Sequence, residues 1–263
     1  MSYPTSIGTS DRASITLLGQ DLAADLMGKV GFAELAYWLV AQRRPTPGEA
    51  RVFESVLVAL ADHGLTPTVI AARLTLTGAP ESVQGAMAAG LLGGGSRYLG
   101  VTEDCGRFLA DALATHVAEG GTAPSTDEEY DDVAREALRR VRAAKRVFPG
   151  LGHPIHKDGD PRTPVLFAIA EEEGVLGPHL KLFAALGRVH PEQLGRTLPL
   201  NGAGVCGAAL SDLGFAPEIL RGFALLARSA GLLGQIAEEM RRPIGQQIYD
   251  AVDGDVEYLP PSP

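Results

Sequence analysis

The sequence predicts an all-α fold, and three observations support this prediction. Apolar residues recur at helical spacing in several segments, and two segments begin with the hydroxyl and glutamate of a helix-capping box. No run of comparable length alternates with the period of two that a half-buried strand needs. The 32 glycines and 18 prolines among the 263 residues interrupt the chain often, so we expect short helices joined by tight turns.

The first half of the chain contains three predicted helices. The earliest has apolar residues at helical spacing, namely Phe32, Leu35, Ala36 and Leu39. The next begins at the capping box Thr46-Pro47-Gly48-Glu49 and runs to about Gly64. The third covers residues 85–90, whose sequence GAMAAG has almost no bulk. Because small side chains let helices approach closely, we expect this segment to be a buried central helix.

The second half continues the helical pattern on both sides of an irregular loop. Thr126 and Glu129 form a second capping box, and this helix has acidic residues at its start and basic residues at its end, which suits its dipole. A long helix is expected over residues 219–230. Residues 147–160 (VFPGLGHPIHKDGD) are too rich in glycine and proline to be helical. Loops of this kind commonly carry functional sites.

Composition and charge exclude several classes of protein. With 45% hydrophobic and 21% charged residues the chain is not disordered, and its net charge of −9 argues against nucleic-acid binding. Cys105 and Cys206 lack metal or redox spacing and the N-terminus lacks a signal-peptide pattern, so we expect a reduced cytoplasmic protein. Arg228 and Gln235 interrupt residues 225–236. No apolar stretch therefore reaches the roughly 18 residues that span a bilayer, and we expect no membrane segment.

Histidines are the most reactive side chains in the predicted loops. His153 and His156 have a spacing that resembles a metal site, but Pro154 lies between them and no nearby cysteine or pair of carboxylates completes a zinc site, so no metal is expected. His63 ends a predicted helix, where the dipole alone favours a histidine. The glycines at 93–95 follow a helix and lack the lysine of a phosphate-binding loop. No GxSxG motif is present either, so serine hydrolysis is not predicted.

Six fragments in order resemble the citrate synthase superfamily and, within it, the short citryl-CoA lyase branch. They cover roughly residues 15–250. The fragments are FAELAY (32–37) with RPT (44–46), ADHG (61–64), GLL to GSRYLG (90–100), GLGH (150–153) with Lys157 and DPR (160–162), ARSAG (227–231) and RPI (242–244). The fourth is the most specific, since it is similar to the family pattern G-x-G-H-x-x-x-K…D-P-R. In the third, Tyr98 resembles the aromatic residue that replaces the synthase histidine in the lyase form.

The resemblance implies an all-α, citrate synthase-like fold with two domains and an active site in the cleft. Residues 1–105 and 201–263 would form the large helical domain, and residues 106–200 the small one. Family members are homodimers in which the arginine of the closing R-P element is typically lent by the partner subunit. Arg242 would therefore contact the neighbour's substrate. No cofactor is expected beyond CoA as part of the substrate.

The resemblance also implies an enzyme, a carbon–carbon lyase that cleaves citryl-CoA or a related β-hydroxyacyl-CoA by a retro-aldol route. The products would be acetyl-CoA, or another acyl-CoA, and oxaloacetate, or another oxo acid. His153 would be the base, His63 would hold the carbonyl or carboxylate of the oxo-acid half, and Tyr98 completes the catalytic set. Carboxylates would be bound by the forked guanidinium groups of Arg97, Arg162, Arg228 and Arg242. CoA would lie along Phe148, Gly150, Leu151, Gly152 and Lys157.

One position departs from the family pattern. The family's N-V-D motif supplies an aspartate that moves the proton at the acetyl carbon, and here the stretch reads Asn201-Gly202-Ala203-Gly204. An acid–base group typically contributes ~10²–10⁴ in rate, so a lyase needs another proton carrier, for which Tyr98, His156 and a water stay open. The glycines beside Ala203 also suggest room for a bulkier acyl group. The alternative function is a catalytically silent homologue that binds CoA esters or dicarboxylates, and condensation in the synthase direction is a third.

Overall fold

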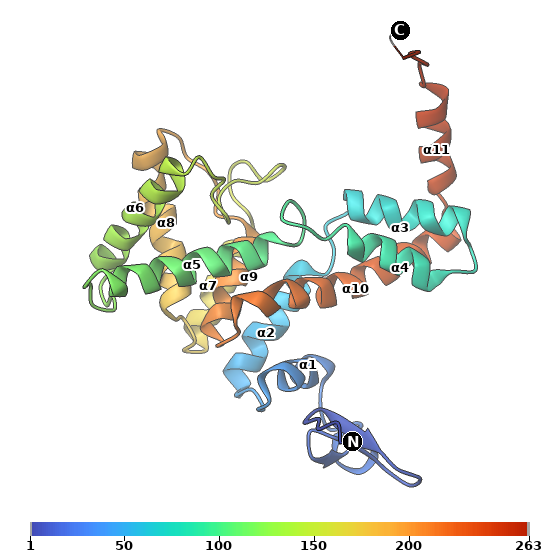
Figure 1. Cartoon of the computed structure of the whole chain (residues 1–263), viewed down its shortest axis with the longest axis horizontal. Coiled ribbons are helices and arrows are strands. Elements are labelled where there is room, and N and C mark those ends of the chain that lie inside the picture. Colours follow the sequence, from blue (N-terminus) through green and yellow to red (C-terminus); the bar gives the residue numbers. More distant parts are fainter. Residues whose placement is uncertain (1, 262–263) are drawn as a thin grey trace.

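The structure, a computed structural model, describes residues 2–261 and is mainly helical (Figure 1), which confirms the predicted fold class. The α-helices in chain order are α1 (Phe32–Ala41), α2 (Pro47–Leu60), α3 (Pro67–Gly78), α4 (Val83–Leu92), α5 (Val101–Ala118), α6 (Asp127–Ala143), α7 (Arg162–Glu172), α8 (Pro178–Leu194), α9 (Gly202–Asp212), α10 (Pro217–Arg241) and α11 (Gly245–Gly254).

A small antiparallel sheet near the N-terminus was not predicted. Its strands β1 (Gly8–Ser10), β2 (Ile15–Leu17) and β3 (Gln20–Asp21) pair in chain order, and a π-helical turn, η1 (Leu22–Leu26), follows directly. Strands of two or three residues are too short to show an alternating pattern. The sheet lies beyond α1, away from the helical body (Figure 1).

Both predicted capping boxes are formed. The Thr46 hydroxyl accepts a hydrogen bond from the Glu49 backbone N–H, and the Glu49 carboxylate accepts one from the Thr46 N–H. Thr126 and Glu129 make the same reciprocal pair at the start of α6. Each box satisfies backbone donors that the first turn of a helix leaves free, so α2 and α6 begin where the sequence places them.

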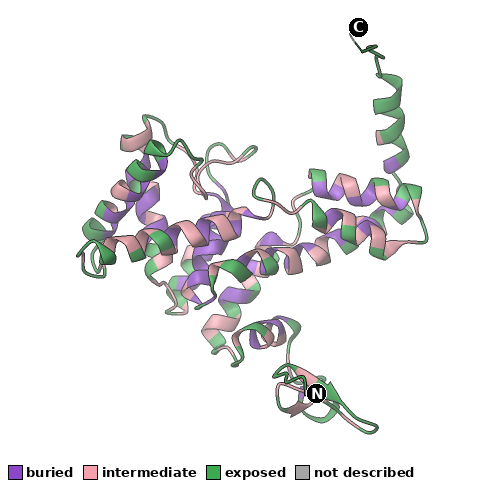
Figure 2. Cartoon of the chain, viewed as in Figure 1, coloured by how far each residue is buried: buried purple, intermediate pink, exposed green. Residues whose placement is uncertain are grey.

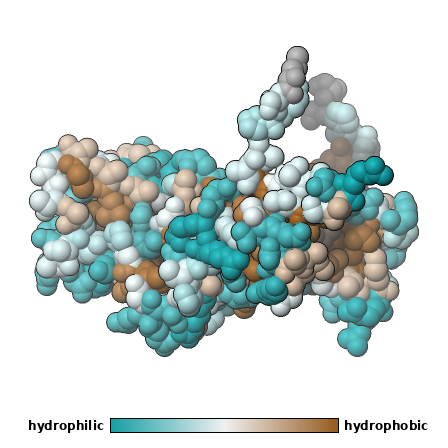
Figure 3. All heavy atoms as spheres, turned by 90° about the horizontal axis from the view of Figure 1, so that it is seen from below, coloured by the Kyte–Doolittle hydropathy of each residue, from teal (hydrophilic) through white to brown (hydrophobic). Residues whose placement is uncertain are grey.

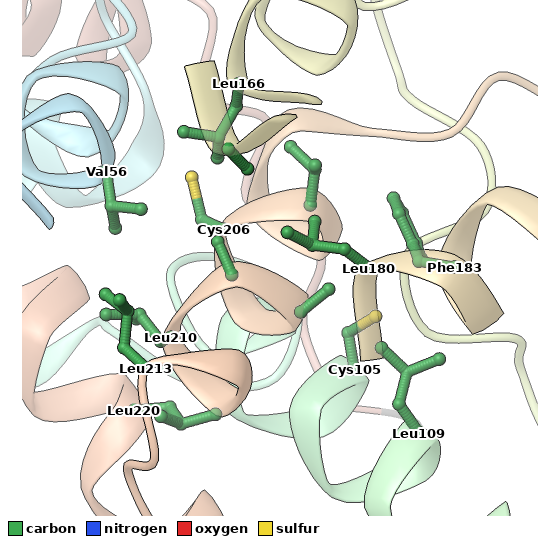
Figure 4. Close-up of a cluster of buried hydrophobic side chains, with 14 of the residues drawn as sticks. Val56, Cys105, Leu109, Leu166, Leu180, Phe183, Cys206, Leu210, Leu213 and Leu220 are labelled. Carbon is green, nitrogen blue, oxygen red and sulfur yellow. The ribbon is translucent and has the colours of Figure 1, made fainter. Parts of the chain in front are cut away.

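The main core is built around α9, which is buried along most of its length (Figure 2). Side chains from α5, α7 and α8 meet those of α9 in Figure 4, where Cys105 and Leu109 lie on one side and Cys206 and Leu166 on the other. This cluster also includes Val56 of α2 and so draws residues from both expected domains. The proposed domain boundaries stay a prediction.

The helix of small residues, α4, is not central as expected. It packs against α3 and α10 at one end of the molecule (Figure 1), and only Ala86 and Gly90 are buried within it. A Cβ at Gly90 would lie 2.7 Å from the Cδ2 atom of Leu232. The small residues therefore serve close contacts with two neighbouring helices, α3 and α10, rather than burial on all sides.

The longest helix, α10, contacts α2, α3, α4, α5 and α9 and so connects the two ends of the body (Figure 1). By length and composition alone it could cross a membrane, which corrects the expectation that no segment would qualify. Its buried residues include Arg228 and Glu239, and a core helix passes the same test. On the face drawn in Figure 3, hydrophilic side chains surround several separate apolar patches.

Candidate active site

A cavity of about 1060 Å³ lies where the end of α2, the turn before α5, the loop after α6, the start of α9 and the middle of α10 meet. All the site residues predicted from the sequence line it except Lys157 and Arg242. The predicted residues that line it are His63, Arg97, Tyr98, Phe148, Gly150, Leu151, Gly152, His153, Arg162 and Arg228.

Three histidines converge beside this cavity, where His63 and His153 belong to its lining and His156 lies next to His153. The ring centroids of His153 and His156 are 4.4 Å apart, and that of His63 lies 5.2 Å from His153 and 5.5 Å from His156. One ring nitrogen of each lies within 4.8 Å of the others, and all three side chains are half-buried. Within residues 2–261, the rings of His63 and His156 make no hydrogen bond. The cluster joins positions far apart in sequence, which is why His156 could not be placed beside His63 beforehand.

The backbone fixes the protonation pattern of His153. Its Nδ1 accepts hydrogen bonds from the N–H groups of Ile155 (3.1 Å) and His156 (3.0 Å). Burial, together with the charges of His156, His63 and Arg162, lowers the pKa of His153 below its ordinary value, against the opposing effect of Asp160. The neutral ring therefore carries its proton on Nε2 and can donate a hydrogen bond there. This arrangement favours a donor role for His153, and its predicted role as base stays a prediction.

Asp160 and Arg162 fasten the loop to the start of α9. Asp160 accepts two hydrogen bonds from the Arg162 guanidinium, at 2.9 and 2.7 Å, and one from the Gly202 N–H at 2.7 Å. Burial alone would raise the pKa of Asp160, but these bonds hold it well below the ordinary value. A Cβ at Gly202 would lie 2.2 Å from Nε of Arg162. Glycine at this position lets the guanidinium lie directly against the first turn of α9.

A second set of contacts joins the loop at Gly150 and Gly152 to the N-terminus of α9. Asn201 donates from its side chain to the carbonyl of Gly152 and accepts from Gly204 N–H, while its backbone N–H donates to Gly150. Gly150 and Gly152 have φ values of 83° and 85°, which favour glycine. The loop and the α9 N-terminus therefore form one rigid wall, in which Ala203 lines the cavity.

Arg228 of α10 is buried, lines the same cavity and has few hydrogen-bond partners among the described residues. It is 5% exposed, and among the described residues its Nε has no hydrogen-bond partner and its other nitrogens make only long contacts, to the Thr66 hydroxyl (3.5 Å) and the Leu60 carbonyl (3.4 Å). Desolvation is the main cause that lowers its pKa, and Arg162 adds to the effect. No carboxylate within residues 2–261 lies at ion-pair distance from it. A buried cation without a counter-ion is costly, so the site is built to receive an anion.

Two predicted residues lie outside the cavity of this chain. Arg242 is exposed at the C-terminal cap of α10, and Lys157 is exposed on the loop. Tyr98 lines the cavity but is 42% exposed. Both cysteines are buried and free, and burial raises the pKa of Cys206 to about 12, so neither is a nucleophile.

The cavity also extends between α5 and α6, which the sequence did not reveal. Its apolar lining there includes Phe108, Ala112, Val133 and Ala137, and Arg146 lies at the rim. The last two of these apolar residues belong to the buried face of α6. A residue on such a face can contact a neighbouring helix or a cavity, and local sequence does not distinguish the two.

Comparisons with known proteins identify related folds. The protein-family profile described as "Citrate synthase, C-terminal domain" matches residues 3–249. The structure of citryl-CoA lyase from Hydrogenobacter thermophilus is similar, with a TM-score of 0.84 and 30% identity over 99% of this chain and 96% of that chain. ATP citrate lyase from Methanothrix soehngenii, solved with citrate and coenzyme A, shares the fold with a TM-score of 0.77 and 22% identity, over 100% of this chain and 42% of that one.

A curated relative gives a similar result. A citrate synthase from Deinococcus radiodurans is 28% identical over 246 residues, which is 90% of this chain but 58% of the relative. The chain thus spans little more than half the length of this relative, and 39% of the probable ATP-citrate synthase subunit 1 of Neurospora crassa, to which it is 26% identical over 99% of its own length.

Proposed function

The chain belongs to the citrate synthase family, and from this premise we propose that it is a carbon–carbon lyase acting on citryl-CoA or a related β-hydroxyacyl-CoA. The products are an acyl-CoA and an oxo acid, with acetyl-CoA and oxaloacetate as the first pair to test. The similarity to a citryl-CoA lyase over nearly the full length of both chains supports cleavage rather than condensation.

The observation that carries this proposal is the buried Arg228 in the cavity that His63 and His153 also line. Its buried guanidinium has no carboxylate partner within the described chain and lines the same cavity as His63 and His153. A citryl group supplies carboxylates for such a cation and a hydroxyl and thioester for the histidines. Arg162 offers a second guanidinium, already oriented by Asp160, so the substrate meets a positive wall that needs little rearrangement.

Cleavage requires the wall to stabilise negative charge on the thioester. The hydroxyl proton leaves, the bond between the hydroxyl carbon and the acyl carbon breaks, and its electron pair moves onto the thioester as an enolate. The Nε2–H of His153 can donate a hydrogen bond to a substrate oxygen whose negative charge changes during cleavage. The arginines hold the oxo-acid half in place, which keeps the breaking bond aligned.

The remaining parts of the proposal concern CoA and assembly. The loop at Phe148, Gly150, Leu151 and Gly152 would contact CoA. Lys157, which is exposed further along the same loop, would also contact CoA. The exposed position of Arg242, outside the cavity of its own chain, supports a homodimer in which it serves the partner's site. We also propose a cytoplasmic location and no cofactor beyond CoA.

A direct cleavage assay tests the function. Purified protein is mixed with citryl-CoA, and oxaloacetate is followed through a malate dehydrogenase couple, with His153→Ala as the control. Turnover that disappears in the control supports a lyase. If the folded wild-type chain gives no turnover, a thermal-shift series of CoA esters and dicarboxylates separates a different substrate from the binding role that the absent carboxylate at Ala203 favours.

A further inference from the structure

We propose that His156 is the acid–base residue of this reaction: it takes the hydroxyl proton of the substrate and returns it to the acyl carbon. This inference rests on the proposed function and chooses one of the proton carriers that the missing carboxylate at Ala203 leaves open. Cleavage needs two proton movements, one from oxygen and one to carbon. The two atoms are two bonds apart in the substrate, so a single imidazole can reach both in turn.

The spacing of the three histidine nitrogens fits one oxygen atom. The nitrogens lie within 4.8 Å of one another, so an atom placed between them can lie within ~2.8 Å of each, which is hydrogen-bonding range. A substrate hydroxyl placed between the rings can therefore contact all three.

Hydrogen-bond roles at that oxygen follow from the contacts of each ring. His153 can only donate, because its Nδ1 already accepts two backbone N–H groups. One of those N–H groups belongs to His156, which fixes His156 beside it with ring centroids 4.4 Å apart. The ring of His156 has no hydrogen bond within residues 2–261, so a nitrogen lone pair is free for the O–H proton. His63, which lines the cavity, is free to donate to the same hydroxyl oxygen.

Two other positions at the start of α9 and the loop before α7 are unsuited to the task. Asp160 is held by Arg162 and the N–H of Gly202, and these bonds keep it ionised without a free lone pair towards the substrate. At position 203, which faces the cavity, the side chain is a methyl group. Its neighbours cannot substitute for it, because a Cβ at Gly202 would meet Arg162, and one at Gly204 would lie 2.7 Å from the Cα of Gly150.

In the proposed step, the lone pair of His156 forms a bond to the hydroxyl proton as the carbon–carbon bond breaks and the oxo acid's carbonyl forms. The imidazolium then transfers this proton to the enolate carbon, which gives the acyl-CoA. The residue ends the cycle neutral, as it began, and no oxidant or further reactant is required. Imidazole suits this exchange near neutral pH.

The experiment compares citryl-CoA cleavage by the wild-type chain and by His156→Gln, with Asp158→Asn on the same exposed loop as the matched control. We expect kcat to fall ~10²–10⁴-fold in His156→Gln, with KM little changed, and the control to behave as wild type. In His156→Gly, added imidazole should restore part of kcat. In the double variant Ala203→Asp/His156→Gln, the new carboxylate should restore turnover without the histidine.

Each outcome decides a different point. Wild-type kcat in His156→Gln would overturn this inference and leave the proposed function intact. A loss that neither imidazole nor Ala203→Asp reverses would mean that His156 only supports the loop, and it would also overturn the inference. No cleavage by the wild-type chain would overturn the proposed function and the inference together.

Discussion

Arg73 and Arg228 are both buried arginines. Arg73 bonds to side chains of α10 and Arg228 belongs to α10, yet their hydrogen-bond partners differ completely. Arg73 of α3 is 2% exposed and donates to Glu238, to Glu239 at 2.8 Å and to Gln235. Glu239 in turn accepts from the N–H groups of Ile244 and Gly245, and so fixes the start of α11. Arg228 is 5% exposed, and its hydrogen-bond partners in the described part of the chain are two neutral oxygens at long distance.

The difference shows which buried charge belongs to the fold and which to a ligand. A buried ion pair with all its hydrogen bonds made costs little to keep and much to break. A buried cation without a counter-ion loses its hydration and gains little in return. Such a group is useful where a bound anion supplies the missing hydrogen bonds. We therefore expect substitutions of Arg73 to lower stability and substitutions of Arg228 to weaken binding.

The largest expected effect is on binding and catalysis at Arg228. In Arg228→Met, we expect kcat/KM for citryl-CoA to fall ~10²–10³-fold, which corresponds to about 3–4 kcal/mol of transition-state stabilisation. The unfolding free energy should stay constant or rise, because an unpaired buried charge is removed. Steady-state kinetics and urea unfolding on the same samples measure both quantities. A variant that unfolds more easily and keeps its kinetics would reverse the comparison.

The next effect is on stability at Arg73. In Arg73→Met, we expect the free energy of unfolding to fall by about 3 kcal/mol, because Glu239 is left buried without its guanidinium. The expected change in kcat/KM is small, since Arg73 does not line the cavity. Chemical denaturation checks the first quantity. The double variant Arg73→Met/Glu239→Gln should lose less than the two single changes together, because no unpaired charge remains.

The two arginines also illustrate how far sequence reasoning reaches. The capping boxes at Thr46 and Thr126 were predicted correctly because a box involves residues only three apart. The resemblance brought His63, His153 and Arg228 to one site because its motifs occur in a fixed order. Nothing near Arg73 in the sequence indicated its partners, which lie more than 160 residues away.

Tertiary contacts explain the remaining differences. The hydrogen-bond role of His153 depends on the backbone N–H groups of Ile155 and His156, which no sequence motif places, so the resemblance could suggest a base without showing these contacts. The central position expected for α4 was wrong because small side chains indicate a close contact but not how many sides are covered. The strands of the N-terminal sheet are too short to give a pattern.

A smaller effect is expected on the free energy of unfolding when acid protonates Glu239, the buried carboxylate that pairs with Arg73. Burial alone would raise the pKa of Glu239, but the N–H groups of Gly245 and Ile244 and the Arg73 guanidinium lower it below the ordinary value. A depressed folded pKa stabilises the fold above the unfolded pKa of about 4.3, and this contribution is lost as pH falls through the folded value. Urea midpoints at pH 7, 5 and 4 should therefore fall more steeply for the wild-type chain than for Glu239→Gln. Parallel profiles would show that Glu239 does not contribute this dependence.

The smallest expected effect concerns the other carboxylate beside Arg73. The side chain of Glu238 is 49% exposed, whereas that of Glu239 is 3% exposed. Water and salt screen an exposed ion pair, so Glu238→Gln should lower the free energy of unfolding by less than about 0.5 kcal/mol. The same urea measurement at low and high salt checks this value. A loss as large as that of Arg73→Met would mean that Arg73 depends on both carboxylates equally, and burial of the partner would no longer separate the structural arginine from the one awaiting a ligand.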